Sequence, residues 1–398
     1  MKLDDLCANI VDCAHKTAPI DVDGEFFAVG TPAMRGNRIN YEEARRVSRE
    51  TFELWTTRLK PQYGDLLLAR EAPVGPVVRI PIEENVAPGQ RTVLLRPNPE
   101  RLDPVFAYYL LASPTIQRRL ISMAEGSTVA HLNVADIREM SVGDLPPLAQ
   151  QRAIAEVLGA LDDKIAANSR TIDVTGQLSD ALFAKALSHV TTRATIRELA
   201  SDGVLIFGDG YRTKRSEHGT PGCRIIRAGD IQDGRVVPSG EDFVAKPFLD
   251  KAAAKIAQPG DIVLTTKGSV GRVAVVPHGV EPSVYSPQLC YFRVSDDHHE
   301  LQPWLATWFR NVDRVAQTDV AMHKTDMAPY VNLQDIGSLS VPVPGPNAPS
   351  ALGKLQALTH RVGAESDVLA KTRDELLPLL MSGKLRIKDA EAKVEEIV

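Results

Sequence analysis

The sequence lacks the features that mark secreted and membrane proteins. No uninterrupted apolar run approaches the roughly 20 residues that a membrane-spanning helix needs. The opening MKLDDLCANIVDCAHK contains acidic residues and no apolar segment of the signal-peptide kind. The chain has 4 cysteines and no C-x-x-C pair, which argues against a zinc knuckle or a redox motif. We therefore expect a cytoplasmic protein with free, buried thiols, no metal site and no membrane partner.

Motifs of common enzymes are also missing. The chain has no G-x-x-x-x-G-K-[ST] phosphate loop, no G-x-G-x-x-G fingerprint and no N/D-P-P-Y/F methyltransferase tetrapeptide. Glu391-Ala392-Lys393 has the E-x-K spacing of a nuclease, but it lies in a charged tail that we interpret as solvated. The sequence therefore predicts a protein without catalytic residues or a cofactor of its own, and a fused single-chain enzyme is improbable.

Proline is absent from residues 154–187, where apolar residues follow a coiled-coil spacing. Steps of four and three alternate from Ile154, which is the pattern of a heptad seam rather than of a strand. Pro146 and Pro147 precede the segment, at a place compatible with a helix start. We predict one helix of roughly 50 Å at about 1.5 Å per residue. Its predicted seam is Leu158, Leu161, Ile165, Asn168, Ile172, Thr175, Ser179 and Leu182.

A second helix repeats this seam 197 residues later, polar interruptions included. Asn168 corresponds to Glu365, and Thr175 corresponds to Thr372. The second predicted seam is Leu355, Leu358, Val362, Glu365, Leu369, Thr372, Leu376 and Leu379.

The rest of the chain is duplicated at nearly the same offset. Gly64-Asp65 corresponds to Gly260-Asp261, and the segment at His131 corresponds to that at Tyr330. Self-similarity of this kind identifies an internal repeat. The chain therefore has the order globular, helix, globular, helix. The predicted domains are 1–145, 146–190, 191–345, 346–388 and a charged tail at 389–398.

The fold class predicted from these patterns is α/β (α+β), with two similar globular domains separated by two long antiparallel coiled-coil helices. Similar halves of one chain tend to adopt a pseudo-twofold arrangement. In the register that we predict, Asn168 lies near Thr372 and Thr175 near Glu365, so that polar residues meet in the middle of the seam. The length of the helices would then set the distance between the sites that the two globular domains bind.

The run PPLAQQRAI at 146–154, followed by LGALDDKI and Asn168, resembles the first conserved helical region of type I restriction-modification specificity (S) subunits. The alternation of two globular domains with two helices resembles the whole plan of these proteins. The segment from Gly210 to Ile231 looks like the opening of one of their target-recognition domains. The resemblance covers residues 1–388. The second helix departs from the family pattern, because Pro349-Ser350-Ala351-Leu352 replaces the usual Leu-x-x-Gln run.

The resemblance implies a non-catalytic subunit that binds double-stranded DNA at a bipartite, asymmetric target, with one half-site for each recognition domain. It also implies two modification (methyltransferase) subunits as partners, which would supply S-adenosylmethionine, and restriction (motor-nuclease) subunits in the full complex. An alternative is a two-lobed coiled-coil scaffold with a non-DNA partner.

Candidate DNA-contacting residues come from basic loops, because phosphate contacts depend on local lysine and arginine rather than on the net charge of −5. For Arg70, Lys267 and Arg272 the alternative interpretation is a solvated charge beside a turn, and for Arg227 it is a side chain that faces inward along its strand. Asp162, Asp163 and Lys164 are interpreted as the exposed side of the first helix, and the resemblance implies that this face meets a methylating subunit. The candidates are Arg35, Arg38, Arg70, Tyr211, Arg212, Lys214, Arg215, Arg227, Lys267 and Arg272.

Overall fold

The chain forms two compact units in the computed structural model. Unit 1 consists of Met1–Ala167 and Ser366–Val398, and unit 2 of Asn168–Glu365. Each unit therefore contains one globular domain and half of each long helix. The structure describes residues 1–124, 130–232, 234–322, 330–345 and 347–397.

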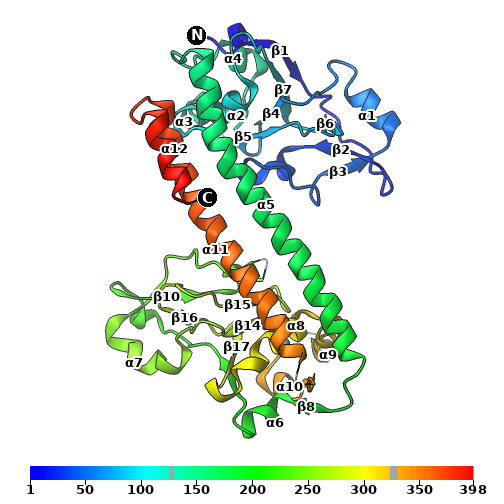
Figure 1. Ribbon diagram of the computed structural model, residues 1–398, viewed down its shortest axis with the longest axis vertical. Helices are drawn as coiled ribbons and strands as arrows, with labels where there is room; N and C mark the ends of the chain where they lie inside the picture. The colour runs from blue at the N-terminus through cyan, green and yellow to red at the C-terminus, as the bar shows by residue number, and fades with distance from the viewer. Residues whose placement is uncertain (125–129, 233, 323–329, 346, 398) are drawn as a thin grey trace. The chain divides into compact units, whose positions relative to one another are not determined.

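Unit 1 contains two small sheets, which we call the main sheet and the side sheet (Figure 1). The main sheet has the order β1-β7-β4-β5 with antiparallel neighbours, and the side sheet has the order β3-β2-β6. The strands are β1 (Cys7–Asp12), β2 (Phe26–Val29), β3 (Arg45–Val47), β4 (Leu66–Arg70), β5 (Val74–Arg79), β6 (Val86–Pro88) and β7 (Thr92–Pro97).

Helices cover the sheets of unit 1. Residues of α2, such as Phe106, share one apolar core with the main sheet and with Leu158 of the first long helix. Asp103 begins α2, where its carboxylate accepts hydrogen bonds from two backbone amides of the first turn. The short helices are α1 (Arg49–Trp55), α2 (Pro104–Ala112), α3 (Pro114–Met123) and α4 (Val134–Glu139).

Unit 2 repeats this plan and extends it. Its main sheet has the order β11-β12-β15-β14-β17-β9, in which β9-β17-β14-β15 matches β1-β7-β4-β5 of unit 1. Its side sheet has the order β13-β10-β16. The strands are β8 (Arg193–Thr195), β9 (Leu205–Asp209), β10 (Gly222–Ile226), β11 (Ile231–Gln232), β12 (Arg235–Val236), β13 (Phe243–Ala245), β14 (Ile262–Thr265), β15 (Val273–Val275), β16 (Ser283–Tyr285), β17 (Leu289–Val294) and β18 (Ser340–Pro342). The short helices are α6 (Ile196–Ser201), α7 (Leu249–Ala252), α8 (Gln302–Arg310), α9 (Val312–Met322) and α10 (Leu333–Gly337).

A buried ion pair recurs in both main sheets and explains the repeated Gly-Asp pair. Asp65 and Asp261 are each 1% exposed and each accept two hydrogen bonds from one arginine. The partners are Arg96 in unit 1 and Arg293 in unit 2, with N–O distances of 2.6–2.9 Å. A bidentate pair of this kind fixes the strand that follows each Gly-Asp pair against its neighbour.

The two long helices are α5 (Leu148–Leu187) and α11 (Ala348–Met381), and they run antiparallel (Figure 1). In unit 1, Leu158, Leu161 and Ile165 of α5 share a core with Leu369 and Leu376 of α11. Position 346, where we expected the second helical domain to begin, lies outside the described residues.

The predicted seam is wrong at Leu379, which is 36% exposed, whereas Leu380 is 3% exposed. An α-helix has 3.6 residues per turn, so a strict heptad drifts around a straight helix. The seam therefore continues from Leu376 to Leu380, a second step of four residues, instead of the step of three to Leu379 that the heptad pattern predicts.

The predicted register is wrong by one heptad. The side-chain amide of Asn168 donates to a carboxylate oxygen of Glu365 at 3.0 Å, instead of approaching Thr372. Asn168 thus lies opposite its own counterpart in the repeat. Because the amide and the carboxylate satisfy each other directly, the seam does not need a second pair of polar residues beside them.

Unit 1 begins with a short 3-10 turn at Asp4–Leu6 followed by β1. Its C-terminal end differs from the sequence prediction. The expected solvated tail contains α12 (Ile387–Glu395), which buries Ala390 and Val394 in the core of unit 1. Within the described part of the chain, no helix has the apolar length that crossing a membrane requires.

Candidate nucleic-acid interface

The loop at 211–215 presents three exposed cations, Arg212, Lys214 and Arg215. Glu217 organises this loop, because it accepts hydrogen bonds from the Tyr211 hydroxyl at 3.1 Å and from the Lys214 amide at 2.9 Å. The bond from the Lys214 amide lowers the pKa of the Glu217 carboxyl, which therefore stays ionised at neutral pH. Tyr211 is thereby a support for the loop, and the three cations face solvent.

Other candidates of unit 2 lie at the ends of strands. Arg227 follows β10, and its guanidinium is 2.5 Å from a carboxylate oxygen of Asp242. Lys267 and Arg272 are exposed and flank the connection between β14 and β15. This connection therefore has a cation at each end, as the sequence predicts.

In unit 1, Arg35 and Arg38 lie on the segment after β2. The side chain of Arg35 is 78% exposed and lies 3.7 Å from Glu43. Arg38 is 47% exposed and lies 3.5 Å from Asp162 on α5. Both guanidinium groups are accessible, and both have carboxylates as neighbours.

Arg70 does not lie in an exposed basic loop, so that expectation is wrong. Its side chain is only 12% exposed, donates to the Leu132 carbonyl at 3.1 Å and lies 3.4 Å from Asp12. Arg70 is the last residue of β4, and its side chain joins this strand to the segment after β1 and to the segment at 131. It is a structural residue, and we withdraw it as a DNA contact.

Asp12, Cys13 and His15 each place a potential metal-ligand atom within 4.8 Å of the others. Arg70 donates to His15 Nδ1 at 3.2 Å, while His15 Nε2 is 2.7 Å from Asp12. The imidazole and the carboxylate are thus engaged with each other and with a guanidinium, whose charge opposes a metal cation. The geometry supports a hydrogen-bonded network here rather than a metal site.

Asp162 is the residue that the sequence analysis misjudged most. Its side chain is 11% exposed rather than solvated, and it accepts hydrogen bonds from Tyr109 of α2 and from Arg373 of α11, both at 2.7 Å. Burial of Tyr109, reinforced by the Asp162 charge, raises the pKa of the phenol, so it remains a donor. Asp162 directly follows the seam residue Leu161, so the sequence already places it beside the seam. This position was the signal that could have predicted a buried side chain.

Comparisons with known proteins agree with this architecture. Residues 2–174 match the family model described as the type I restriction modification DNA specificity domain. The type I restriction enzyme MjaVIII specificity subunit of Methanocaldococcus jannaschii is 20% identical over 316 residues, 72% of this chain and 72% of that protein.

A curated relative and a solved structure from Mycoplasma genitalium are also similar to this chain. The putative type I specificity subunit S.MgeORF438P is 30% identical over 263 residues, 62% of this chain and 61% of that protein. The crystal structure of a type I restriction-modification system S subunit has the same fold, with a TM-score of 0.58 and 18% identity over 96% of this chain and 95% of that one.

Proposed function

We propose that this chain, which belongs to the specificity subunits of type I restriction-modification systems, binds double-stranded DNA at a bipartite, asymmetric target. Each globular domain would bind one half-site. The observation that carries this proposal is the duplicated fold with different loops: the main sheets and side sheets match, but the loop at 211–215 has three exposed cations where the matching residues 14–18 have the single lysine Lys16. Two similar frames with different exposed side chains are what two different half-sites require.

The proposed domains follow from the same duplication. Residues 1–145 and 191–345 are the target-recognition domains, and 146–190 and 346–388 are the helical spacers. α5 has 40 residues, which corresponds to about 60 Å at 1.5 Å per residue. We propose that the helices fix the separation of the half-sites, so that adding one heptad to each would lengthen the tolerated DNA spacer without changing either half-site.

The chemistry of the system belongs to partners. The relatives are named specificity subunits, and the role of this chain is recognition rather than catalysis. Two modification subunits would methylate adenine in the target with S-adenosylmethionine, and restriction subunits would complete the complex. The internal repeat supports two copies of the modification subunit, since each half of the chain contains a globular domain of similar topology followed by a long helix.

Exchange of one recognition domain tests the proposal. Residues 1–145 would be replaced by those of a relative that keeps a tyrosine at the position of Tyr109, so that the contact with Asp162 survives. The chimaera would be expressed with its modification subunits, and methylated sites would be mapped by long-read sequencing. We expect one half-site to change and the other to remain. A change of both half-sites, or of neither, would contradict one half-site per domain.

Salt dependence tests the binding itself. Phosphate contacts release counterions, so retention of the full chain on duplex DNA must weaken as salt rises. A chain that bound its partner subunits but no DNA at low salt would instead be a scaffold.

A further inference from the structure

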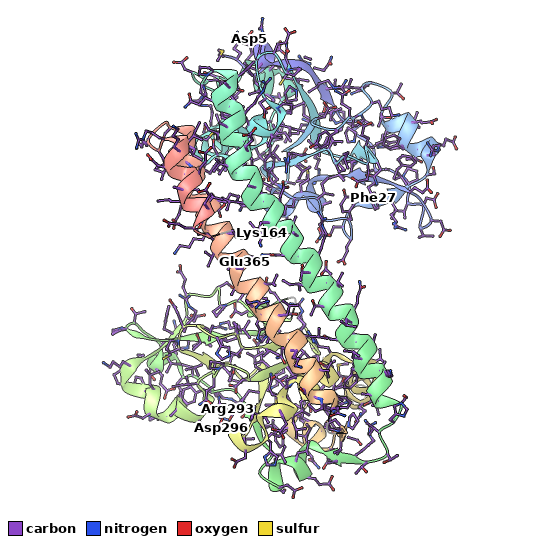
Figure 2. The ribbon with its side chains drawn as sticks, in the orientation of Figure 1. Asp5, Phe27, Lys164, Arg293, Asp296 and Glu365 are labelled. Atoms are coloured by element: carbon purple, nitrogen blue, oxygen red, sulfur yellow. The ribbon has the colours of Figure 1, made fainter. Side chains whose placement is uncertain are left out.

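The side sheets of the two units share one feature on their solvent-exposed side. Phe27 of β2 lies opposite Arg46 of β3, and Arg224 of β10 lies opposite Phe243 of β13. The guanidinium of Arg46 is 5.6 Å from the centre of the Phe27 ring, and that of Arg224 is 4.8 Å from the centre of the Phe243 ring. Figure 2 labels Phe27 on its strand.

These two pairs are equivalent, but their residues have exchanged places. Phe27 and Arg224 are 197 residues apart, and so are Arg46 and Phe243. The strand registers agree as well, because β2 and β10 each pair with one antiparallel and one parallel neighbour. What the two units share is therefore a guanidinium stacked on a phenyl ring, and not a residue type at one position.

Each guanidinium is held in place by a second contact. Nη1 of Arg46 donates to the Val22 carbonyl at 3.2 Å, and Nη1 of Arg224 donates to the Gly240 carbonyl. Stacking on a ring and one backbone hydrogen bond fix the plane of a guanidinium, which leaves its remaining N–H groups for a planar or tetrahedral oxyanion.

A second cation reinforces the charge of each side sheet. Arg49 lies 5.0 Å from the centre of the Phe26 ring in unit 1, and Lys251 lies 5.3 Å from that of Phe248 in unit 2. Both cations belong to the helix that follows the outer strand, α1 or α7. Each domain thus places two cation–aromatic pairs on and beside its side sheet.

Carboxylates limit the size of the anion that can bind beside Arg46 and Arg224. Arg46 lines an open hollow of about 700 Å³ that also includes Tyr41, Glu42 and Glu43. In unit 2, Glu281 lies 4.0 Å from Arg224. Because these negative charges border the guanidinium groups, the geometry fits one anionic group per domain better than a continuous track of phosphates.

We propose that Arg46 and Arg224 are equivalent contacts to the DNA phosphate backbone, one in each half-site. This inference rests on the proposed function. The two domains would bind different base sequences, so a structure present in both must contact what the two half-sites have in common, which is the sugar-phosphate backbone. Diverged loops such as 211–215 then contact the bases.

The test measures binding of the full chain to two duplexes of unrelated sequence over a salt series. We expect Arg46→Ala and Arg224→Ala each to weaken binding about tenfold at low salt, as for loss of one charged hydrogen bond. Each should lower the slope of log affinity against log salt by about 0.9. Arg118→Ala is the matched control, because Arg118 is exposed on α3 and, among the residues that the structure describes, its guanidinium donates to the Pro114 carbonyl alone.

A transposed variant distinguishes the stacked cation from a charge at one position. Phe27→Arg combined with Arg46→Phe gives unit 1 the arrangement that unit 2 has naturally, and we expect it to bind within about twofold of the unaltered chain. Far-UV circular dichroism and thermal unfolding check that each variant is folded.

Three results would overturn the inference while leaving the proposed function intact: an unchanged salt slope in both alanine variants, a loss confined to one DNA sequence, or a transposed variant as weak as Arg46→Ala. Failure of the unaltered chain to bind any duplex at low salt would instead contradict the proposed function.

Discussion

The two units attach to their long helices by different chemistry. In unit 1, Asp162 of α5 accepts hydrogen bonds from Tyr109 of the globular domain and from Arg373 of α11. In unit 2, Phe183 of α5 is fully buried, with its ring centre 4.4 Å from that of Trp304. The two contacts lie at positions that are not equivalent in the repeat, because the offset of 197 residues relates Asp162 to Thr359 and Phe183 to Leu380. Leu380 is 3% exposed in the core of unit 1, so both units have a buried apolar residue at this position, whereas Thr359 has no carboxylate to match that of Asp162.

The buried ion pairs occupy equivalent positions of the repeat, and the same interaction is present in both units. One difference remains between them. The Tyr285 hydroxyl donates to Asp261 at 2.7 Å, whereas Pro88 occupies the matching position in unit 1 and has no hydroxyl. Burial of Tyr285, with the nearby Asp261 charge, raises the pKa of the phenol, so this donor stays protonated.

Removal of these aspartates should have the largest effect on stability. Asp65→Ala and Asp261→Ala each leave a half-buried arginine, 19% or 17% exposed, without its carboxylate partner, and we expect a loss of about 3 kcal/mol of unfolding free energy. Asp261→Ala should cost about 1–3 kcal/mol more, because it also leaves the Tyr285 hydroxyl unpaired. Urea unfolding of the full chain measures both. Equal losses would show that Tyr285 contributes nothing, and the pair Asp261→Leu with Arg293→Met should recover much of the loss.

Truncation of the aromatic junction should come next. Phe183→Ala removes a ring that is 0% exposed and leaves a cavity against Trp304, with an expected loss of about 3–4 kcal/mol. Leu178→Ala on the same helix is the control, because Leu178 is 47% exposed. Thermal unfolding should show a clear decrease for the first variant and almost none for the second. Similar losses of stability in both variants would show that the contact between Phe183 and Trp304 does not hold α5 against the globular domain of unit 2.

The polar junction should be weaker. Asp162→Asn preserves shape but removes the charge that Tyr109 and Arg373 share, with an expected loss of about 1–3 kcal/mol. Asp163→Asn changes an exposed neighbour in the same way and should stay within about 0.5 kcal/mol of the unaltered chain. If Asp162→Asn and Asp163→Asn unfold at the same urea concentration, the contacts of Asp162 do not stabilise the junction.

Periodicity and internal repetition were enough to predict the arrangement of helices and repeated domains from the sequence. The limits of α5, the duplicated strands and the antiparallel helices all follow from patterns that extend over many residues. Register did not follow, because Asn168 has two plausible polar partners one heptad apart, and only the observed hydrogen bond to Glu365 distinguishes them.

Individual site residues were predicted less well for a physical reason. A basic residue beside a glycine-rich turn has the same sequence context whether its side chain points outward, as in Lys267, or back into the domain, as in Arg70. The arginine–phenylalanine pairs were missed because they join strands that are distant in sequence. Only their transposed spacing of 197 residues, considered together with the strand register, identifies them.

The smallest expected effect concerns two arginines that share one oxygen. Arg373 lies 2.7 Å from Oδ1 of Asp162, whereas Arg38 lies 3.5 Å from the same atom and is 47% exposed. A long, exposed ion pair contributes at most about 0.5 kcal/mol, so Arg38→Ala should leave the urea midpoint nearly unchanged. Arg373→Ala should cost about 1–3 kcal/mol, because it removes a short, charged hydrogen bond. If Arg38 contacts DNA, its substitution should weaken binding at low salt while stability stays constant. A loss of stability equal to that of Arg373→Ala would instead make Arg38 part of the junction that holds α5.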